Sequence, residues 1–282
     1  MGGDRRPLTT PLSPALRAFD ALAGRFDERF GTWASVAAQR RAVRRELLAA
    51  FPEGASLLEL GGGTGEDALF LAGRGRRIFL TDGAPAMVEK ARQKAATAGL
   101  AERIEAETVA IEDLPGFASR RASGGKPSFD GAYSNFAAFN CVSELPAAGR
   151  GLANLLRAGG RALLVVFGPW APGEVVTLLC RGRPGAAFRR LSHVATARIE
   201  GREFTVAYPR PRDFASAFAP WFTLRRVLGV GIFVPPSSAE PEISQWPRLL
   251  GALEALDRLA ARPLGLLGDH VLLDFERTSR SP

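Results

Sequence analysis

Apolar residues recur at two spacings along the chain, and the change between them marks the predicted elements. From residue 15 to residue 50 the spacing is helical, and Pro52-Glu53-Gly54 ends this region. Beyond it, short apolar runs alternate with amphipathic stretches. The short runs predict strands at 56–60, 76–81, 103–109, 129–134 and 161–167, and the amphipathic stretches predict helices at 65–74, 85–98 and 145–157.

This alternation predicts βαβ units and therefore a parallel sheet, because parallel neighbours need a crossover long enough to cover the sheet face. The predicted fold class is α/β with a doubly wound sheet. Residues 118–127 (ASRRASGGKP) are small, polar and rich in glycine. They predict an exposed loop.

After residue 167 the pattern changes. It predicts a helix-like stretch at 174–179, a hairpin at 198–208 that turns at Glu200-Gly201-Arg202, a helix near 211–218, a strand near 222–230, a helix within 239–262 and a last strand at 271–278. We therefore expect three parts: an N-terminal helical lid (1–52), a ligand-binding core (53–169) and late strands of the core (170–282). Two insertions in the last part, about 170–209 and 233–268, are candidates for a substrate cap.

Composition agrees with an ordinary globular protein. Of the 282 residues, 46% are hydrophobic and 23% are charged, which is enough apolar material for a large core. The net charge of +8 invites a nucleic-acid partner, yet only three of the cations are lysines and the arginines are scattered along the chain, often in pairs. Solvated helix faces explain this distribution better than a phosphate-binding surface does.

Scarce cysteine and histidine exclude several kinds of site. Two cysteines far apart in sequence predict no disulfide framework, and two histidines predict no zinc site or other metal centre. The segment MGGDRRPLTTPLSP has no apolar core of signal-peptide length, and no later stretch offers about 18 uninterrupted apolar residues. We expect a cytoplasmic protein without a membrane span.

The stretch LLELGGGTG (57–65) carries the strongest chemical signal. A dinucleotide fingerprint needs a third glycine where this chain has Glu66, and Glu66 and Asp67 at a helix start would repel a pyrophosphate. Glycines at 61, 63 and 65 instead suit a ligand without phosphate, pressed against bare backbone. Asp82, 21 residues after Gly61, ends the next predicted strand, where a carboxylate can accept both ribose hydroxyls. Together these features describe an adenosine without phosphate.

ELGGGTG followed by LTDGAPAMVEKAR resembles the class I S-adenosylmethionine-dependent methyltransferases, over about residues 15–167 and the last strand. The resemblance implies a Rossmann-like, mostly parallel seven-stranded sheet with cap insertions. It also implies the cofactor S-adenosyl-L-methionine, with S-adenosyl-L-homocysteine as its product. The cofactor-binding residues that it implies are Glu59, Gly61, Gly62, Gly63, Asp82, Gly83, Met87, Ala110, Ile111, Glu112, Ser134, Asn135 and Phe136.

Two positions depart from the family pattern. The family usually has an aspartate where this chain has Ala110, so the adenine amino group would rely on backbone near Ala110 and Ile111 or on Glu112. The lid often carries a Tyr-Asp pair where this chain has Phe26-Asp27, which leaves only a shape role for Phe26. Asn140 is expected to support the turn after the fourth strand.

Methyl transfer is an in-line displacement that depends mainly on positioning, and only some acceptors need a general base. The candidate bases are His270, at the start of the last strand near Gly168-Pro169-Trp170, and His193 in the cap; each is weighed against a purely structural role. An apolar acceptor pocket would be walled by Trp170, Phe188, Phe204, Trp221, Phe233 and Trp246, unless these aromatics pack against the core.

The expected function is transfer of a methyl group to an oxygen or nitrogen atom of a small, partly apolar or aromatic metabolite. Two alternatives stay open: a methyltransferase-fold protein that binds or regulates without catalysing, and an RNA methyltransferase. A nicotinamide-dependent oxidoreductase is disfavoured by Glu66 and Asp67.

Overall fold

The fold was obtained as a computed structural model and is described for residues 12–280. The first eleven residues of the polar N-terminal segment, in which we expect no signal peptide, lie outside the described residues.

Within residues 12–280 the central element is a seven-stranded sheet with the order β3-β2-β1-β4-β5-β9-β8. Strands β1 to β5 run parallel, whereas β9 lies antiparallel between β5 and β8. This confirms the predicted mostly parallel α/β sheet. The strands are β1 (Ser56–Leu60), β2 (Arg77–Asp82), β3 (Ile104–Thr108), β4 (Phe129–Ser134), β5 (Leu156–Phe167), β8 (Phe222–Val230) and β9 (His270–Arg277).

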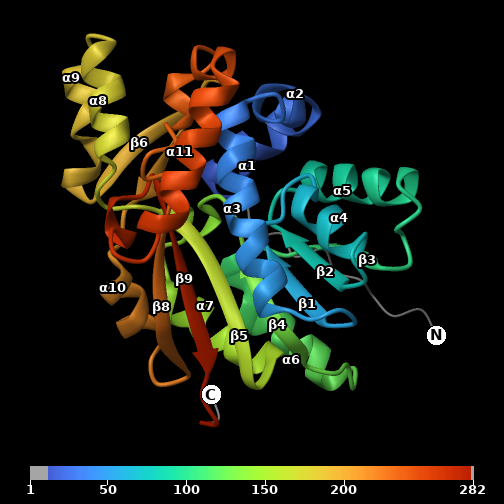
Figure 1. The fold of residues 1–282 in the computed structure, drawn as a ribbon. Coiled ribbons are helices and arrows are strands. Elements are labelled where there is room, and N and C mark those ends of the chain that lie inside the picture. Colours follow the sequence, from blue (N-terminus) through green and yellow to red (C-terminus); the bar gives the residue numbers. More distant parts are fainter. Residues whose placement is uncertain (1–11, 281–282) are drawn as a thin grey trace.

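Helices cover both faces of the sheet (Figure 1). On one face α3, α4 and α5 bury apolar side chains such as Leu47, Leu71 and Val88 against the strands. On the other face α6, α7 and α10 contribute Phe117, Leu152 and Phe218. The helices are α3 (Ala34–Ala50), α4 (Glu66–Ala72), α5 (Pro85–Thr97), α6 (Leu114–Ser123), α7 (Leu145–Leu155) and α10 (Pro211–Phe218).

Helix α6 contradicts the loop predicted at 118–127. The chain stays helical to Ser123, and only the glycines that follow leave the helix. The physical reason is tertiary packing: the ring of Phe117 lies 5.4 Å from that of Phe79 on β2, and Arg121 covers the ring of Phe129. A single buried aromatic residue just before the polar run therefore outweighs the local composition.

The segments that flank the sheet gather at one end of the molecule (Figure 1). They comprise the N-terminal helices, the helices of both insertions and a separate hairpin, whose predicted turn at Glu200 and Gly201 is confirmed by positive φ angles at both residues. Helix α1 packs against the second strand of this hairpin. The elements are α1 (Pro14–Leu22), α2 (Phe26–Phe30), α8 (Pro172–Cys180), α9 (Pro184–Ala187), α11 (Pro247–Ala260), β6 (Val194–Ile199) and β7 (Arg202–Ala207).

No helix in the described part of the chain is long and apolar enough to cross a lipid bilayer.

Candidate functional site

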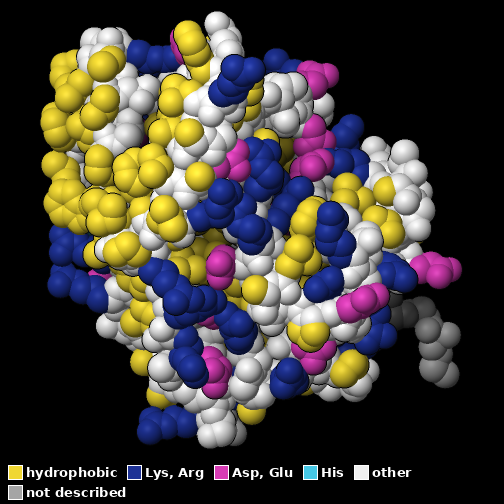
Figure 2. Space-filling model, viewed as in Figure 1, with side chains coloured by type: hydrophobic (Ala, Val, Ile, Leu, Met, Phe, Trp, Pro, Cys, Tyr) yellow, Lys and Arg dark blue, Asp and Glu magenta, His cyan; other side chains and the backbone are white. Residues whose placement is uncertain are grey.

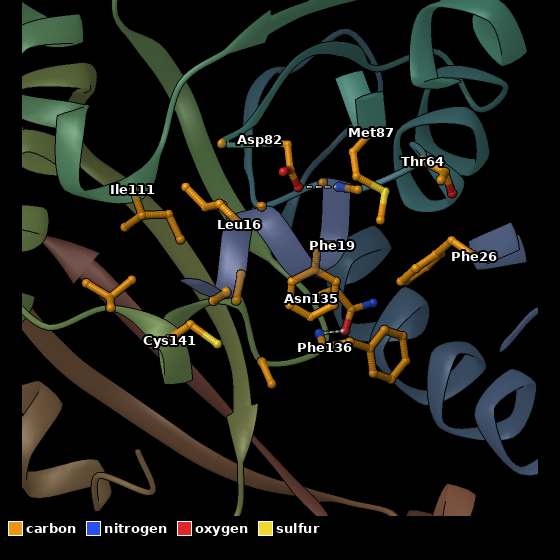
Figure 3. A pocket seen from close by; sticks show the side chains of 18 of the residues that line it. Leu16, Phe19, Phe26, Thr64, Asp82, Met87, Ile111, Asn135, Phe136 and Cys141 are labelled. Atoms are coloured by element: carbon orange, nitrogen blue, oxygen red, sulfur yellow. Dashed lines mark hydrogen bonds between the residues drawn. The ribbon is translucent and has the colours of Figure 1, made fainter. Parts of the chain in front are cut away.

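A cavity of about 280 Å³ opens where β1, β2 and β4 end (Figure 3). This is the edge at which parallel α/β sheets bind ligands. Asp82 and Met87 lie on one side of it, and Phe136 and Cys141 lie across from them. The predicted cofactor-binding residues in its lining are Glu59, Gly61, Gly62, Gly63, Asp82, Gly83, Met87, Ile111, Glu112, Asn135 and Phe136.

The glycine loop presents bare backbone to this cavity. Gly61 has a φ of +63°, and a Cβ there would lie 2.4 Å from the Cβ of Ala138, so no other residue fits without moving the loop. Gly63 has a φ of +55° but open space around it. A ligand can therefore approach the main chain at Gly63, as the sequence predicts.

Asp82 is fixed at the end of β2 by two backbone donors. Its Oδ2 accepts a hydrogen bond from the N–H of Gly63 at 2.8 Å, and its Oδ1 accepts one from the N–H of Ala84 at 2.8 Å. Burial raises the pKa of Asp82, and these two donors counteract it. Each carboxylate oxygen has a second lone pair, so the oriented group can still accept ribose hydroxyls.

Glu59, at the end of β1, is buried beneath the glycine loop. Its Oε2 has no hydrogen-bond partner among the described residues, and the same holds for the hydroxyl of Tyr133, its register partner on β4. Burial raises the pKa of Glu59 well above its ordinary value, and the charge of Asp67 raises it further. A buried carboxylate oxygen without a partner fits the ammonium group of a methionine-derived cofactor.

Replacing Glu59 with glutamine is expected to weaken cofactor binding at least about tenfold, because the ligand's ammonium loses a charged partner. The raised pKa also sets the pH dependence. Without cofactor, at pH values between the ordinary and the raised pKa of Glu59, this carboxyl is protonated in the folded protein but ionised in the unfolded chain. The free energy of unfolding of the wild type therefore falls as pH rises through that window. The Glu59→Gln variant should lack this pH dependence of stability.

Calorimetric titration with S-adenosylhomocysteine and thermal unfolding, both as a function of pH, measure the two effects. Glu89→Gln, at an exposed carboxylate on α5, is the matched control. Equal affinities and parallel pH profiles for wild type and Glu59→Gln would show that Glu59 does not face the ligand.

An arginine pair from α3 enters the site, which sequence reasoning missed. Arg40 Nη1 donates to Asp67 at 2.8 Å, and Arg44 Nε donates to the other oxygen at 2.6 Å. Arg40 also lines the cavity, with its guanidinium 4.8 Å from the ring centre of Phe136. Since Lys94 pairs with Glu66, both acids at the start of α4 have cationic partners, and the predicted repulsion of a pyrophosphate is weaker than their formal charges imply.

The turn after β4 is held in an uncommon conformation. Phe136 and Ala137 have φ angles of 53° and 72° although neither is glycine. Asn135 stabilises the turn: its Oδ1 accepts the N–H of Phe136 at 2.9 Å, and its Nδ2 donates to Asp67 at 2.7 Å. Backbone strain of this kind is typical of functional sites. Asp67 is thus the hydrogen-bond acceptor for the buried side-chain amide of Asn135.

The N-terminal helices are tied to the glycine loop. Thr64 Oγ1 donates to Asp27 at 2.6 Å, and Lys94 Nζ donates to the same carboxylate at 2.9 Å. Phe26 lines the cavity beside them. Asp27 therefore anchors the lid. Phe26, which stands where the resembling family often has a tyrosine, contributes only its ring.

Four predicted site residues do not line the cavity: Ala110, Ser134, His193 and His270. His270 starts β9 at the expected edge but lies behind the cavity wall, stacked 4.9 Å from Phe167 and edge-on to Phe136 at 5.4 Å. Its Nδ1 is 3.0 Å from Gln39 Oε1. His193 is exposed beyond the hairpin. The structure thus gives neither histidine the position of a general base.

Much of the cavity lining outside the glycine loop, Glu59 and Asp82 is apolar. Of the six aromatics predicted to form it, only Phe204 does; Trp221 packs against the core, and Trp170, Phe188, Phe233 and Trp246 are exposed. Apart from Ile111, the other apolar lining was not predicted from the sequence, because the hairpin and the N-terminal helices meet only in the folded chain. These residues are Ala15, Leu16, Phe19, Ile111, Ala138, Val142, Phe167, Ala197, Ile199 and Val206.

Asn140 joins this wall to the sheet. Its Oδ1 accepts the N–H of Phe167 at 2.9 Å, and its Nδ2 donates to the carbonyl of Ala207 at 2.7 Å. The end of β5, the turn after β4 and the hairpin are therefore fixed relative to one another. Among residues 12–280, no group of three or more histidine, cysteine or acidic side chains is arranged to hold a metal ion.

Comparisons with known proteins show what this fold and its glycine-loop region resemble. A family model described as a methyltransferase domain matches residues 57–160. No curated protein matches the chain. Among solved structures, an S-adenosylmethionine-dependent methyltransferase described as putative, from Listeria monocytogenes, is 15% identical, with a TM-score of 0.56 over 86% of this chain and 98% of that chain.

Two further structures have the same fold. An S-adenosylmethionine-dependent methyltransferase from Mesorhizobium loti is 18% identical, with a TM-score of 0.52 over 85% of this chain and 98% of its own. Geranyl diphosphate C-methyltransferase from Streptomyces coelicolor is 14% identical, with a TM-score of 0.52 over 84% of this chain and 76% of its own. Residues 57–160, which hold the glycine loop and the carboxylate that ends β2, therefore match a methyltransferase domain, and the chain has the fold of S-adenosylmethionine-dependent methyltransferases.

Proposed function

We propose that this protein transfers a methyl group from S-adenosylmethionine to an oxygen or nitrogen atom of a small acceptor with an apolar or aromatic body. The observation that carries the proposal is the division of the cavity: one side presents bare backbone, Glu59 and Asp82, and the other is apolar.

The residues on the polar side match the parts of the cofactor. Asp82 would accept the ribose hydroxyls, and Glu59, with its partnerless Oε2, would face the ammonium group. Arg40 is the cation in the cavity lining that would face the carboxylate. Met87 and Ile111 would border the adenine. When bound, S-adenosylmethionine supplies a methyl group on a positively charged sulfur.

The apolar side accounts for the acceptor. Phe19 packs on Phe204 with ring centres 5.7 Å apart, so α1 and the hairpin form one continuous wall that excludes water. The titratable groups bordering this side are Glu112 and Cys141, and burial raises the pKa of the Cys141 thiol to about 11. An uncharged thiol is a poor base, so positioning would supply most of the rate enhancement.

Glu112 is the group best placed to accept a proton. Burial raises its pKa, which increases the basicity of the carboxylate. A phenol loses its proton readily, and a neutral amine attacks through its lone pair and loses a proton only after the transfer, so either acceptor makes little demand on such a base.

Incubation of the protein with methyl-labelled S-adenosylmethionine and fractionated small-molecule extracts tests the proposal. We expect label to appear in a compound with an apolar or aromatic body. Saturable cofactor binding with no labelled product across polar and apolar fractions alike would instead support a non-catalytic binding protein.

The hairpin variant Phe204→Ala is expected to lower methyl transfer about tenfold or more, because a missing apolar contact in a pocket costs roughly 1–3 kcal/mol. Its affinity for S-adenosylhomocysteine should not change. Glu203→Ala is the matched control, since neighbouring residues on a strand point to opposite faces. A Phe204→Ala protein that is folded and transfers methyl groups at the wild-type rate would place the acceptor elsewhere.

A further inference from the structure

Exposed apolar side chains are unevenly distributed over the molecule. In the described part of the chain, every large apolar side chain that is strongly exposed lies between residues 170 and 266. Figure 2 shows a broad hydrophobic area over α8 and α9. We name it the cap surface and define it by Trp170, Val176, Leu179, Phe188, Leu191 and Val194.

The cap surface is continuous. Trp170, Phe188 and Leu191 border one shallow crevice of about 120 Å³, so residues from before α8 and after α9 lie side by side. Helix α8 packs on α9 and adds Val176 and Leu179, which are 60% and 45% exposed. A clustered apolar area of this kind on a globular protein indicates an interaction site.

Cations outnumber acids in this segment. Residues 170–194 contain four arginines and a single acid, Glu174. Glu174 is buried and paired with Arg189 and Arg190. Arg181 and Arg183 are exposed, with Arg181 paired to Glu242, and cationic groups border the hydrophobic area in Figure 2. The segment thus presents apolar and aromatic groups rimmed by positive charge.

The surface also has a rigid base. Buried Arg190 donates to the carbonyl oxygens of Gly168 and Asp269 at 2.9 and 2.7 Å, and to the Asp269 carboxylate at 2.6 Å. These bonds fix the segment to the ends of β5 and β9. The apolar side chains are therefore held in place rather than carried on a loose loop.

We propose that the cap surface docks onto the surface of an anionic lipid bilayer. Tryptophan and phenylalanine favour the boundary between headgroups and acyl chains, and arginines at the rim attract anionic headgroups. A second copy of the chain fits less well, because a symmetric contact would bring the net positive rims of both copies together. The proposal does not depend on the methyl acceptor. It does place the bilayer next to the hairpin, since Val194 begins β6 and Ala197 and Ile199 line the cavity.

Vesicle sedimentation tests the proposal with the full-length protein. Vesicles of phosphatidylcholine containing about one-third phosphatidylglycerol should bind the protein, whereas pure phosphatidylcholine should bind it much less. Trp170→Ser with Phe188→Ser, or Arg181→Glu with Arg183→Glu, should lower the bound fraction about fivefold or more. Thermal unfolding and S-adenosylhomocysteine binding should match those of the wild type.

Lys126→Glu, at an exposed cation next to α6 and away from the cap surface, is the charge control and should bind like the wild type. Three results would overturn the proposal. They are absence of binding to anionic vesicles, equal loss with Lys126→Glu, and self-association that the Trp170 and Phe188 variants abolish. The last would identify the cap surface as an interface between copies of this chain.

Discussion

Asp82→Ala is expected to weaken binding of S-adenosylhomocysteine by about two orders of magnitude. The carboxylate would accept two ribose hydroxyls, and a hydrogen bond to a charged group contributes about 1.5–3 kcal/mol. The substitution also removes the acceptor for the N–H groups of Gly63 and Ala84, which orient the glycine loop. Isothermal titration calorimetry measures the change.

Asp82→Asn separates the two contributions. The amide keeps one oxygen for the loop but loses the charge and one acceptor, so its affinity should lie between those of the wild type and Asp82→Ala. Glu89→Ala, which removes an exposed carboxylate from α5, should bind like the wild type. Retention of full affinity by a folded Asp82→Ala protein would remove Asp82 from the cofactor site.

Arg190→Met is expected to destabilise the protein by about 3–5 kcal/mol, because two buried carboxylates lose the buried cation that they share, which leaves Glu174 only the partly exposed Arg189 and Asp269 only Gln39 and His270. Burial by itself lowers the pKa of Arg190, but Asp269 and Glu174 outweigh it and raise the pKa, so the guanidinium stays charged. For a domain of this size the unfolding midpoint should fall by roughly 10 °C. Differential scanning calorimetry provides the measurement.

A second substitution distinguishes charge from packing. Arg190→Met combined with Glu174→Gln should recover part of the lost stability, because one of the uncompensated charges is gone. Arg183→Met changes an exposed arginine of the same segment and should unfold like the wild type. If Arg190→Met alone also unfolds at the wild-type temperature, the buried cluster contributes nothing to holding the cap.

The polar half of the cavity, which we propose holds the cofactor, could be predicted because it is encoded locally. Gly61, Gly63 and Asp82 lie at the ends of strands that are short, apolar and unambiguous, and the rule that ligands bind at the carboxyl edge needs no knowledge of packing. The strand bounds differ from prediction mostly by a residue at either end; β5 begins earlier, at Leu156. The seven-stranded sheet follows from these strands and from β8 and β9.

The acceptor half could not be predicted, because its parts are distant in sequence. Phe19 and Phe204 meet only when α1 packs on the hairpin. Arg40 lies on a helix whose apolar spacing was visible, yet nothing in that spacing shows that its polar face reaches Asp67. His270 was placed at the correct edge of the sheet, but its stacking on Phe167 depends on side-chain orientation, which periodicity does not report.

The two ends of the hairpin are paired with each other: Val194 lies opposite Ala207. A loop whose ends are adjacent can be exchanged for another of different length without displacing the strands on either side of it in sequence. Residues 195–206 also lie outside the segment that matches the methyltransferase domain. If the proposed acceptor wall is correct, substrate choice is separable from cofactor use, and a library confined to those residues offers a direct route to redesigned methyltransferases.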